Sequence, residues 1–128
     1  MKDTFTDWAN LPEPLDPFGD PYKALLESGE AIAAYIATMS SHYVDEQLAS
    51  EHFRDSRAVL RLLPVDTLRA GHADTNIRDR AKERRYTKLN PLTMPPLVVQ
   101  AGNIEDGNHR FRIGKKRKQT HFWCYDVE

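Results

Sequence analysis

The chain has 128 residues, 40% of them hydrophobic and 29% charged, which is the composition of a folded domain and not of a disordered chain. Its net charge of −1 conceals an asymmetry, because residues 1–60 carry eleven acidic and four basic side chains whereas residues 61–128 carry eight and fourteen. A basic half favours a phosphate-bearing partner, either a nucleotide or a nucleic acid, but it can equally pack against the acidic half.

Several protein classes do not fit this composition. The single cysteine, Cys124, excludes an internal disulfide and a zinc site built from several cysteines. No apolar run approaches the roughly 20 residues of a membrane-spanning helix, and the first residues lack the apolar core of a secretory signal. We therefore expect a cytoplasmic protein with no membrane partner.

The first 20 residues are expected to form an irregular arm, because three prolines and a glycine interrupt any helical pattern. Trp8 and Phe18 are expected to pin this arm to the body of the protein. Asp20 and Pro21 have the character of a helix start, an acidic N-cap followed by proline at the first helical position. A helix is therefore predicted through Tyr22–Met39, where apolar residues recur at helical spacing.

A second helix is predicted from Asp45 to about Ser56, with Leu48 and Phe53 on its buried side. The pattern then changes near residue 58, where a run of β-branched and leucine residues begins. We therefore divide the chain into an N-terminal arm and helical segment, residues 1–57, and a second unit, residues 58–128.

The second unit alternates short apolar runs with helical patterns. Its predicted elements are a strand from Ala58 closed by Pro64 and Asp66, a helix Asp74–Leu89, a strand Leu97–Gln100, a turn, a strand Ile104–Asp106, a helix Asn108–Lys118 and a strand Thr120–Val127. This order predicts an α+β fold, in which a small mixed sheet with short helices follows the N-terminal helical segment.

The junction between the strand ending at Asp106 and the next helix contains Gly107, Asn108, His109 and Arg110. Backbone N–H groups at a helix start lack intrahelical partners, and the helix dipole adds positive potential, so an anion is favoured there. Gly107 allows a tight turn, Asn108 is a natural N-cap, and His109 and Arg110 add donors. We interpret these residues as a phosphate-binding site, although the same pattern also occurs as plain structure.

Two acidic residues, Glu105 and Asp106, immediately precede this glycine. Carboxylates can hold a magnesium ion or accept a proton from a hydroxyl group. Asp106 is therefore predicted as a magnesium ligand, and Glu105, Asp106 and His109 as catalytic residues. A nucleoside triphosphate with its metal would use all of these groups.

The order of short motifs in the second half resembles that of the ParB/sulfiredoxin-like superfamily, in particular its small ParB-like domains with a DGNHR box. The resemblance covers about residues 59–128. The motifs that carry it are LPVDTLR, NIR, RRYTKL, MPPLVV, IEDGNHRFRIGKK and THFWCYDV.

This resemblance implies a nucleotide-binding fold whose box, Asp106 to Arg110, cradles phosphates. It adds Asn76 and Arg78, which look like the N-x-R motif of partition proteins, to the predicted phosphate ligands. Members of the superfamily include CTP-hydrolysing partition proteins, ATP-dependent sulfiredoxins, kinases of free serine and ParB-like nucleases. Sulfiredoxins have a catalytic cysteine where this chain has Asn108, so sulfinic-acid reduction is not expected. The helix-turn-helix domain that follows the box in partition proteins does not follow it here, so a centromere-binding role is not expected either.

Three functions remain open from the sequence. The first is an enzyme that binds a nucleoside triphosphate, ATP or CTP with magnesium, and hydrolyses or transfers its phosphate. The second is a DNA- or RNA-binding protein or a ParB-like nuclease, which the basic half favours equally. The third is a catalytically inactive phage or plasmid protein whose acidic helical half engages a partner protein.

Overall fold

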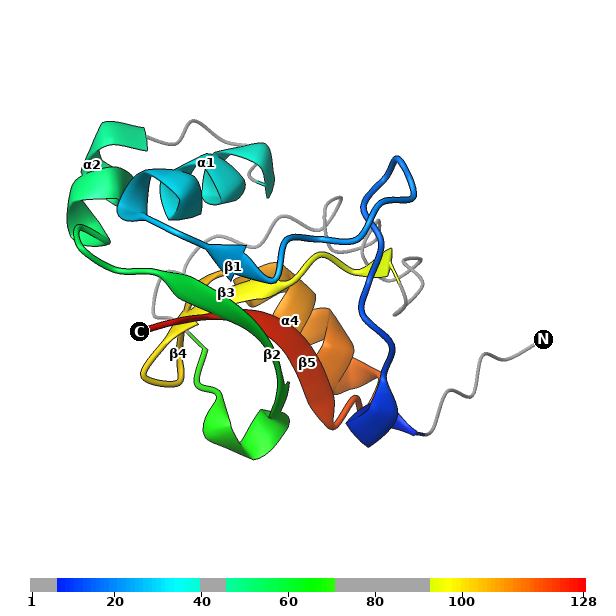
Figure 1. The fold of residues 1–128 in the computed structure, drawn as a ribbon. Helices are drawn as coiled ribbons and strands as arrows, with labels where there is room; N and C mark the ends of the chain where they lie inside the picture. The colour runs from blue at the N-terminus through cyan, green and yellow to red at the C-terminus, as the bar shows by residue number, and fades with distance from the viewer. Residues whose placement is uncertain (1–6, 40–45, 71–92) are drawn as a thin grey trace.

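The computed structural model describes residues 7–39, 46–70 and 93–128, which build one five-stranded sheet with helices on both faces (Figure 1). The strand order is β1-β2-β5-β3-β4, and the strands are β1 (Leu25–Leu26), β2 (Ala58–Pro64), β3 (Leu97–Gln100), β4 (Asn103–Asp106) and β5 (His121–Val127). The helices are η1 (Trp8–Asn10), α1 (Gly29–Met39), α2 (Glu46–His52), η2 (Val65–Thr67) and α4 (Asn108–Lys116).

The sheet is mixed, because β3 and β5 run parallel while the other neighbouring strands run antiparallel. The predicted α+β class with a small mixed sheet and short helices is therefore confirmed. Strands β2, β3, β4 and β5 and helix α4 lie where the sequence pattern placed them, to within a few residues. The predicted helix of residues 74–89 lies outside the described residues.

Alternation along the central strands divides the core between the two faces of the sheet. Val98 and Tyr125, which are paired in the β3–β5 register, pack with Ile32 of α1 in one buried cluster. Leu97 and its partner Cys124 belong to a second cluster, which includes residues of α4. The central strands are therefore buried on both faces, which explains their continuous apolar sequences.

The N-terminal segment and the second half share the first of these clusters. It contains Phe53, at the end of α2, together with Ala58 of β2 and Val127 of β5. Strand β1 also pairs with β2 in the same sheet, Leu26 opposite Ala58. The start of β2 therefore does not interrupt the hydrophobic core.

Helix α1 begins at Gly29, and the predicted helix start at Asp20 and Pro21 is wrong. Ser28 caps the helix, because its Oγ accepts a hydrogen bond from the N–H of Ala31 at 3.1 Å. Gly29, which interrupts the predicted helical stripe, packs so closely on α2 that an added Cβ would lie 2.6 Å from the carbonyl oxygen of Phe53.

The other predicted buried residues of the N-terminal half divide evenly. Phe53 is buried at 3% exposure, but Leu48 is 63% exposed, so α2 turns this leucine to solvent. Trp8 is buried and confirms the expected anchor of the arm, and the indole Nε1 of Trp123 donates to the Leu11 carbonyl at 2.9 Å. Phe18 is 90% exposed, so the prediction that it also pins the arm is wrong.

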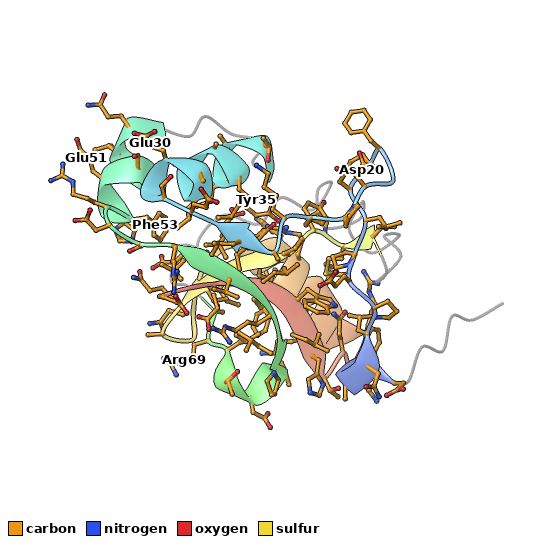
Figure 2. All side chains as sticks on the ribbon, in the orientation of Figure 1. Asp20, Glu30, Tyr35, Glu51, Phe53 and Arg69 are labelled. Carbon is orange, nitrogen blue, oxygen red and sulfur yellow. The ribbon has the colours of Figure 1, made fainter. Side chains whose placement is uncertain are left out.

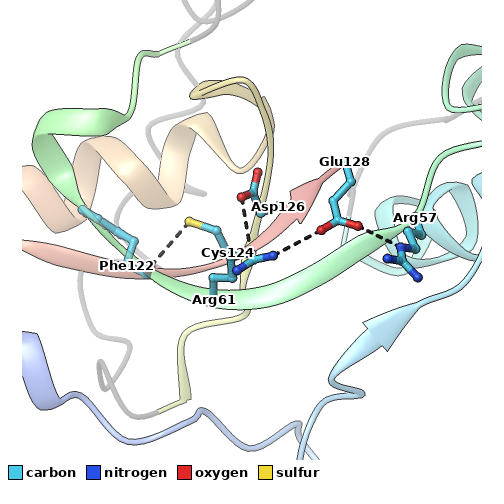
Figure 3. A network of polar contacts seen from close by, with 6 residues as sticks. All are labelled: Arg57, Arg61, Phe122, Cys124, Asp126 and Glu128. Atoms are coloured by element: carbon cyan, nitrogen blue, oxygen red, sulfur yellow. Dashed lines mark hydrogen bonds and ion pairs between the residues drawn. The ribbon is translucent and has the colours of Figure 1, made fainter.

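An exposed network of ion pairs joins β2 to the end of the chain (Figure 3). Glu128 accepts from Arg57 at 2.8 Å and from Arg61 at 3.2 Å, and Arg61 also lies 3.5 Å from Asp126. The hydrogen bond from Arg57 is the main reason that the pKa of the Glu128 carboxyl lies below its usual value. Among the described residues, no helix combines the length and apolarity needed to cross a membrane.

Candidate functional site

The predicted box lies at the junction between β4 and α4, and a β-bulge precedes it. Val98 pairs with Asp106 and Val99 pairs with Ile104, so Glu105 is an extra residue on β4. A bulge bends its strand and re-aims the side chains beside it. The two predicted acidic residues therefore leave the strand in directions that a regular alternation would not give.

Gly107 is the residue on which this junction depends. Its φ of 104° lies in the left-handed region, and it is the N-cap of α4. The prediction that Asn108 is the cap is wrong, because Asn108 is the first residue of the helix. An added Cβ at Gly107 would lie 2.6 Å from Leu97 Cδ2 and 2.8 Å from Arg110 Nη2. The position therefore requires glycine for both its backbone angle and its space.

Arg110 points into the protein and is only 3% exposed. Its Nη1 donates to the carbonyl oxygens of Pro95 at 2.9 Å and Pro96 at 3.2 Å, and its Nη2 lies 3.0 Å from Asp106 Oδ2. The structure therefore places this guanidinium, which was predicted to bind a phosphate, against a carboxylate and two backbone carbonyls, and phosphate binding by Arg110 stays a prediction. One turn of helix places Arg110 over Asp106, and consecutive prolines supply the other two acceptors.

Tyr35 of α1 completes the surroundings of this guanidinium and was not singled out from the sequence. Its hydroxyl donates to the Pro96 carbonyl at 2.5 Å, and its ring lies edge-on to Tyr125 with centroids 4.8 Å apart. Burial raises the pKa of Tyr35 far above its usual value, although Arg110 opposes this. Figure 2 shows Tyr35 pointing from α1 toward the sheet. Its position three residues after Ile32 on the helix is the signal that could have found it.

Glu105 has a different partner from Asp106. Its Oε1 lies 3.6 Å from Nε2 of His52, at the end of α2, and its side chain is 33% exposed. Asp106, in contrast, is 19% exposed and is paired with Arg110. Glu105 therefore contacts α2 and Asp106 contacts α4. Of these two carboxylates, only that of Glu105 keeps substantial contact with solvent.

The structure describes only some of the remaining predicted site residues. His109 is half-buried in the first turn of α4. Asn76 and Arg78 lie outside the described residues. In the ranges that the structure describes, there is no group of three or more histidine, cysteine, aspartate or glutamate side chains that could hold a metal ion. Asp106 Oδ2 is paired with the Arg110 guanidinium, and its role as a magnesium ligand remains a prediction.

Cys124 lies in the core, as expected for a cysteine without a catalytic role. It is fully buried in β5, and its Sγ lies 3.5 Å from the Phe122 carbonyl oxygen (Figure 3). Burial raises the pKa of its thiol far above the usual range, so almost none of it is the reactive thiolate near neutral pH.

A polar cavity of about 390 Å³ lies away from this junction, between the start of α1 and the end of α2. Its lining residues are Ser28, Gly29, Glu30, Ser50, Glu51, Arg54 and Asp55. The acidic side chains among them are exposed, and the cavity shares no residue with the predicted box.

The junction combines a fixed turn with a helix start whose first turn contains no acidic residue. The N-cap provides no side-chain hydrogen bond. The carboxylate of Asp106, which precedes Gly107, is paired with Arg110. No acidic side chain of the first turn opposes the positive end of the helix dipole, which favours an anion there.

Comparisons of this chain with protein-family models, with curated protein sequences and with solved structures gave no match.

Proposed function

We propose that the β4–α4 junction binds the phosphate groups of a nucleoside triphosphate. The observation that carries the proposal is the start of α4, a nine-residue helix entered through a left-handed glycine and without an acidic residue in its first turn. Oxygen-rich anions are the ligands that such a helix end favours. The resemblance of the second half to ParB/sulfiredoxin-like domains supports a nucleotide as their source.

The roles of the box residues follow from their contacts. The backbone around Gly107 and the half-buried His109 would contact the phosphates. Arg110 and Asp106 would act beneath them as a positioning pair, because their side chains are engaged with each other. Hydrolysis or transfer of the terminal phosphate is part of the proposal, with Glu105 the carboxylate best exposed to accept a proton.

A thermal-shift panel of ATP, ADP, CTP and GTP, each with and without magnesium, tests this proposal. A ligand at a hundred times its Kd stabilises the folded state by about 2.7 kcal/mol, which raises Tm by several degrees for a domain of this size. We expect at least one triphosphate to give this shift and His109→Ala to remove most of it. Release of inorganic phosphate under the same conditions then measures turnover.

His121→Ala is the matched control, because His121 is also partly buried but begins β5, away from the box. Its shift should equal that of the unmodified chain. Two results would refute the proposal: no nucleotide raises Tm, or His109→Ala and His121→Ala behave alike.

A nucleic-acid ligand is the second candidate, and the exposed basic residues at the end of α4 favour it. Lys115, Lys116 and Lys118 are all exposed in or just after the last turn of that helix. Contacts of this kind with phosphates weaken steeply as salt rises. Binding to a DNA or RNA duplex that is lost between 50 and 200 mM salt, and lost at low salt when all three lysines are replaced by glutamine, would support this candidate.

A further inference from the structure

The loop between η1 and β1 projects away from the sheet and ends in a tightly bonded turn (Figure 1). Leu15 and Pro21 form an isolated antiparallel bridge at its base. The N–H of Asp16 donates to the Asp20 carbonyl at 2.8 Å, and the N–H of Gly19 donates to the Asp16 carbonyl at 2.9 Å. These backbone bonds close residues 16–20 into a single compact turn.

The side chain of Asp16 locks the same turn from inside. Its Oδ1 accepts hydrogen bonds from the N–H groups of Phe18 at 2.8 Å and Asp20 at 2.9 Å. Pro17 restricts the backbone between them, and Gly19 supplies a φ of 87°. Four hydrogen bonds in five residues therefore fix the conformation before any partner arrives.

What this rigid turn presents to solvent is an aromatic ring. Phe18 is 90% exposed, and Leu15 beside it at the base is 44% exposed. The ring contributes little to the core, so packing within the chain does not explain why phenylalanine stands at the tip. Held on a pre-organised turn, such a ring loses little conformational entropy on binding, which is the property of an anchor residue in a protein interface.

The charge around the turn indicates the chemistry of its partner. Residues 7–30 contain six acidic residues and one basic residue. In the loop itself, the exposed acidic residues are Glu13 and Asp20 and the exposed basic residue is Lys23, and Figure 2 shows Asp20 on the projecting turn. A convex apolar tip with an acidic surround is complementary to a concave apolar pocket with a basic rim. An anionic membrane surface would instead repel this segment.

We propose that the turn Asp16–Asp20 docks onto another protein by inserting Phe18 into an apolar pocket that is bordered by lysine or arginine side chains. This surface lies on the N-terminal arm, and the proposal is independent of nucleotide binding at the β4–α4 junction. The side chain of Phe18 supplies the affinity, Asp16 holds it in place, and the acidic surround sets the orientation.

The test starts with the full chain carrying the photoreactive residue p-benzoylphenylalanine in place of Phe18, in the cells that naturally produce it. Irradiation should join position 18 to one protein, and peptide mapping should place the cross-link beside apolar residues with lysine or arginine nearby. The captured protein is then purified, and its Kd for the unmodified chain is measured. Phe18→Ala should weaken this binding about 30-fold, and Asp16→Ala should weaken it by a smaller factor because the ring remains but the turn loosens.

Leu48→Ala is the matched control, since it removes another exposed apolar side chain, on α2, and should leave the Kd unchanged. Because Phe18 is almost fully exposed, Phe18→Ala should keep the Tm of the unmodified chain, which separates lost binding from lost folding. The proposal is overturned if no protein is cross-linked, if the cross-links reach only this chain itself or a second copy of it, or if the purified protein binds the Phe18→Ala and unmodified chains equally well.

Discussion

Two turns of this chain are built from the same residue types, but one exposes a side chain and the other buries one. The turn of residues 16–20 and the turn of residues 106–110 each begin with an aspartate whose side chain is hydrogen-bonded within the turn, and each contains a glycine with a positive φ, 87° at Gly19 and 104° at Gly107. The first turn presents Phe18 to solvent, whereas the second buries Arg110. An apolar side chain is thus outside and a charged one inside, the reverse of the usual distribution.

The difference lies in what surrounds each turn. An added Cβ at Gly19 meets nothing within 4 Å, whereas one at Gly107 meets Leu97 and Arg110. The carboxylate of Asp16 accepts hydrogen bonds from backbone amides, whereas that of Asp106 accepts one from a guanidinium. The first turn is therefore stabilised by hydrogen bonds within itself, and the second by the elements packed around it. A turn of the first kind is free to serve a partner, and a turn of the second kind is part of the domain's architecture.

The largest effect is expected from removing the buried guanidinium. Arg110→Met deletes an ion-pair partner of Asp106 and the hydrogen bonds that the guanidinium donates to the Pro95 and Pro96 carbonyls, although Pro96 keeps the hydrogen bond from Tyr35. Loss of one member of a buried pair costs about 3 kcal/mol or more, so the free energy of unfolding measured in urea should fall by at least that amount.

Arg61→Met is the control for this substitution, because Arg61 is also ion-paired but is 47% exposed. An exposed pair contributes about 0.5 kcal/mol. Equal losses for the two variants would show that Arg110 is not embedded as its contacts indicate, and would favour the phosphate-binding role predicted from the sequence.

The next effect compares the two glycines directly. Both Gly19→Ala and Gly107→Ala impose the left-handed backbone cost of about 1 kcal/mol, but only Gly107→Ala also forces atoms apart in a packed site, which adds about 1–2 kcal/mol. Urea unfolding of the two variants should therefore differ by at least about 1 kcal/mol, with Gly107→Ala the less stable. If Gly19→Ala proves as damaging, the projecting turn is packed against something and is not the free surface described above.

For the region around residues 106–110, the sequence predicted the secondary structure better than the contacts of the side chains. Strands β3, β4 and β5 and helix α4 were predicted from local periodicity, because the spacing of apolar residues within each segment is enough to indicate its secondary structure. The position of the Arg110 side chain depends on the carbonyls of Pro95 and Pro96, which are 15 and 14 residues away. It also depends on Tyr35, whose hydroxyl binds the Pro96 carbonyl 61 positions along the chain. Such convergence is a property of the tertiary fold and leaves only faint signals in a single sequence.

The first region was misread for a local reason. Asp20 and Pro21 have the residue types of a helix start, yet Asp20 is held in the turn by the side chain of Asp16 and Pro21 forms the bridge to Leu15. The same residues that start helices also stabilise turns, because both structures need a fixed φ and a side-chain acceptor for backbone amides. The pattern therefore predicted a helix start at residues that form a turn and an isolated bridge.

The smallest effect on stability is expected outside both turns, at the exposed ion-pair network around Glu128. Its size shows how much an exposed polar contact contributes to the stability of this domain. The pKa of Glu128 is lowered in the folded chain, chiefly by the hydrogen bond from Arg57. The folded state therefore holds this proton less tightly than the unfolded state. The resulting stabilisation is present above the ordinary carboxyl pKa of about 4.3 and fades as the pH falls through the lower, folded value.

Glu128→Gln removes this contribution without changing the size of the side chain. The difference in Tm between the unmodified chain and this variant should be small and positive at neutral pH and should close as the solution is acidified through that range. It should also shrink at 1 M salt, because both partners are exposed. A difference that persists unchanged in acid and at high salt would mean that this network is shielded from water as Arg110 is, and that exposure alone does not separate weak polar contacts from strong ones in this domain.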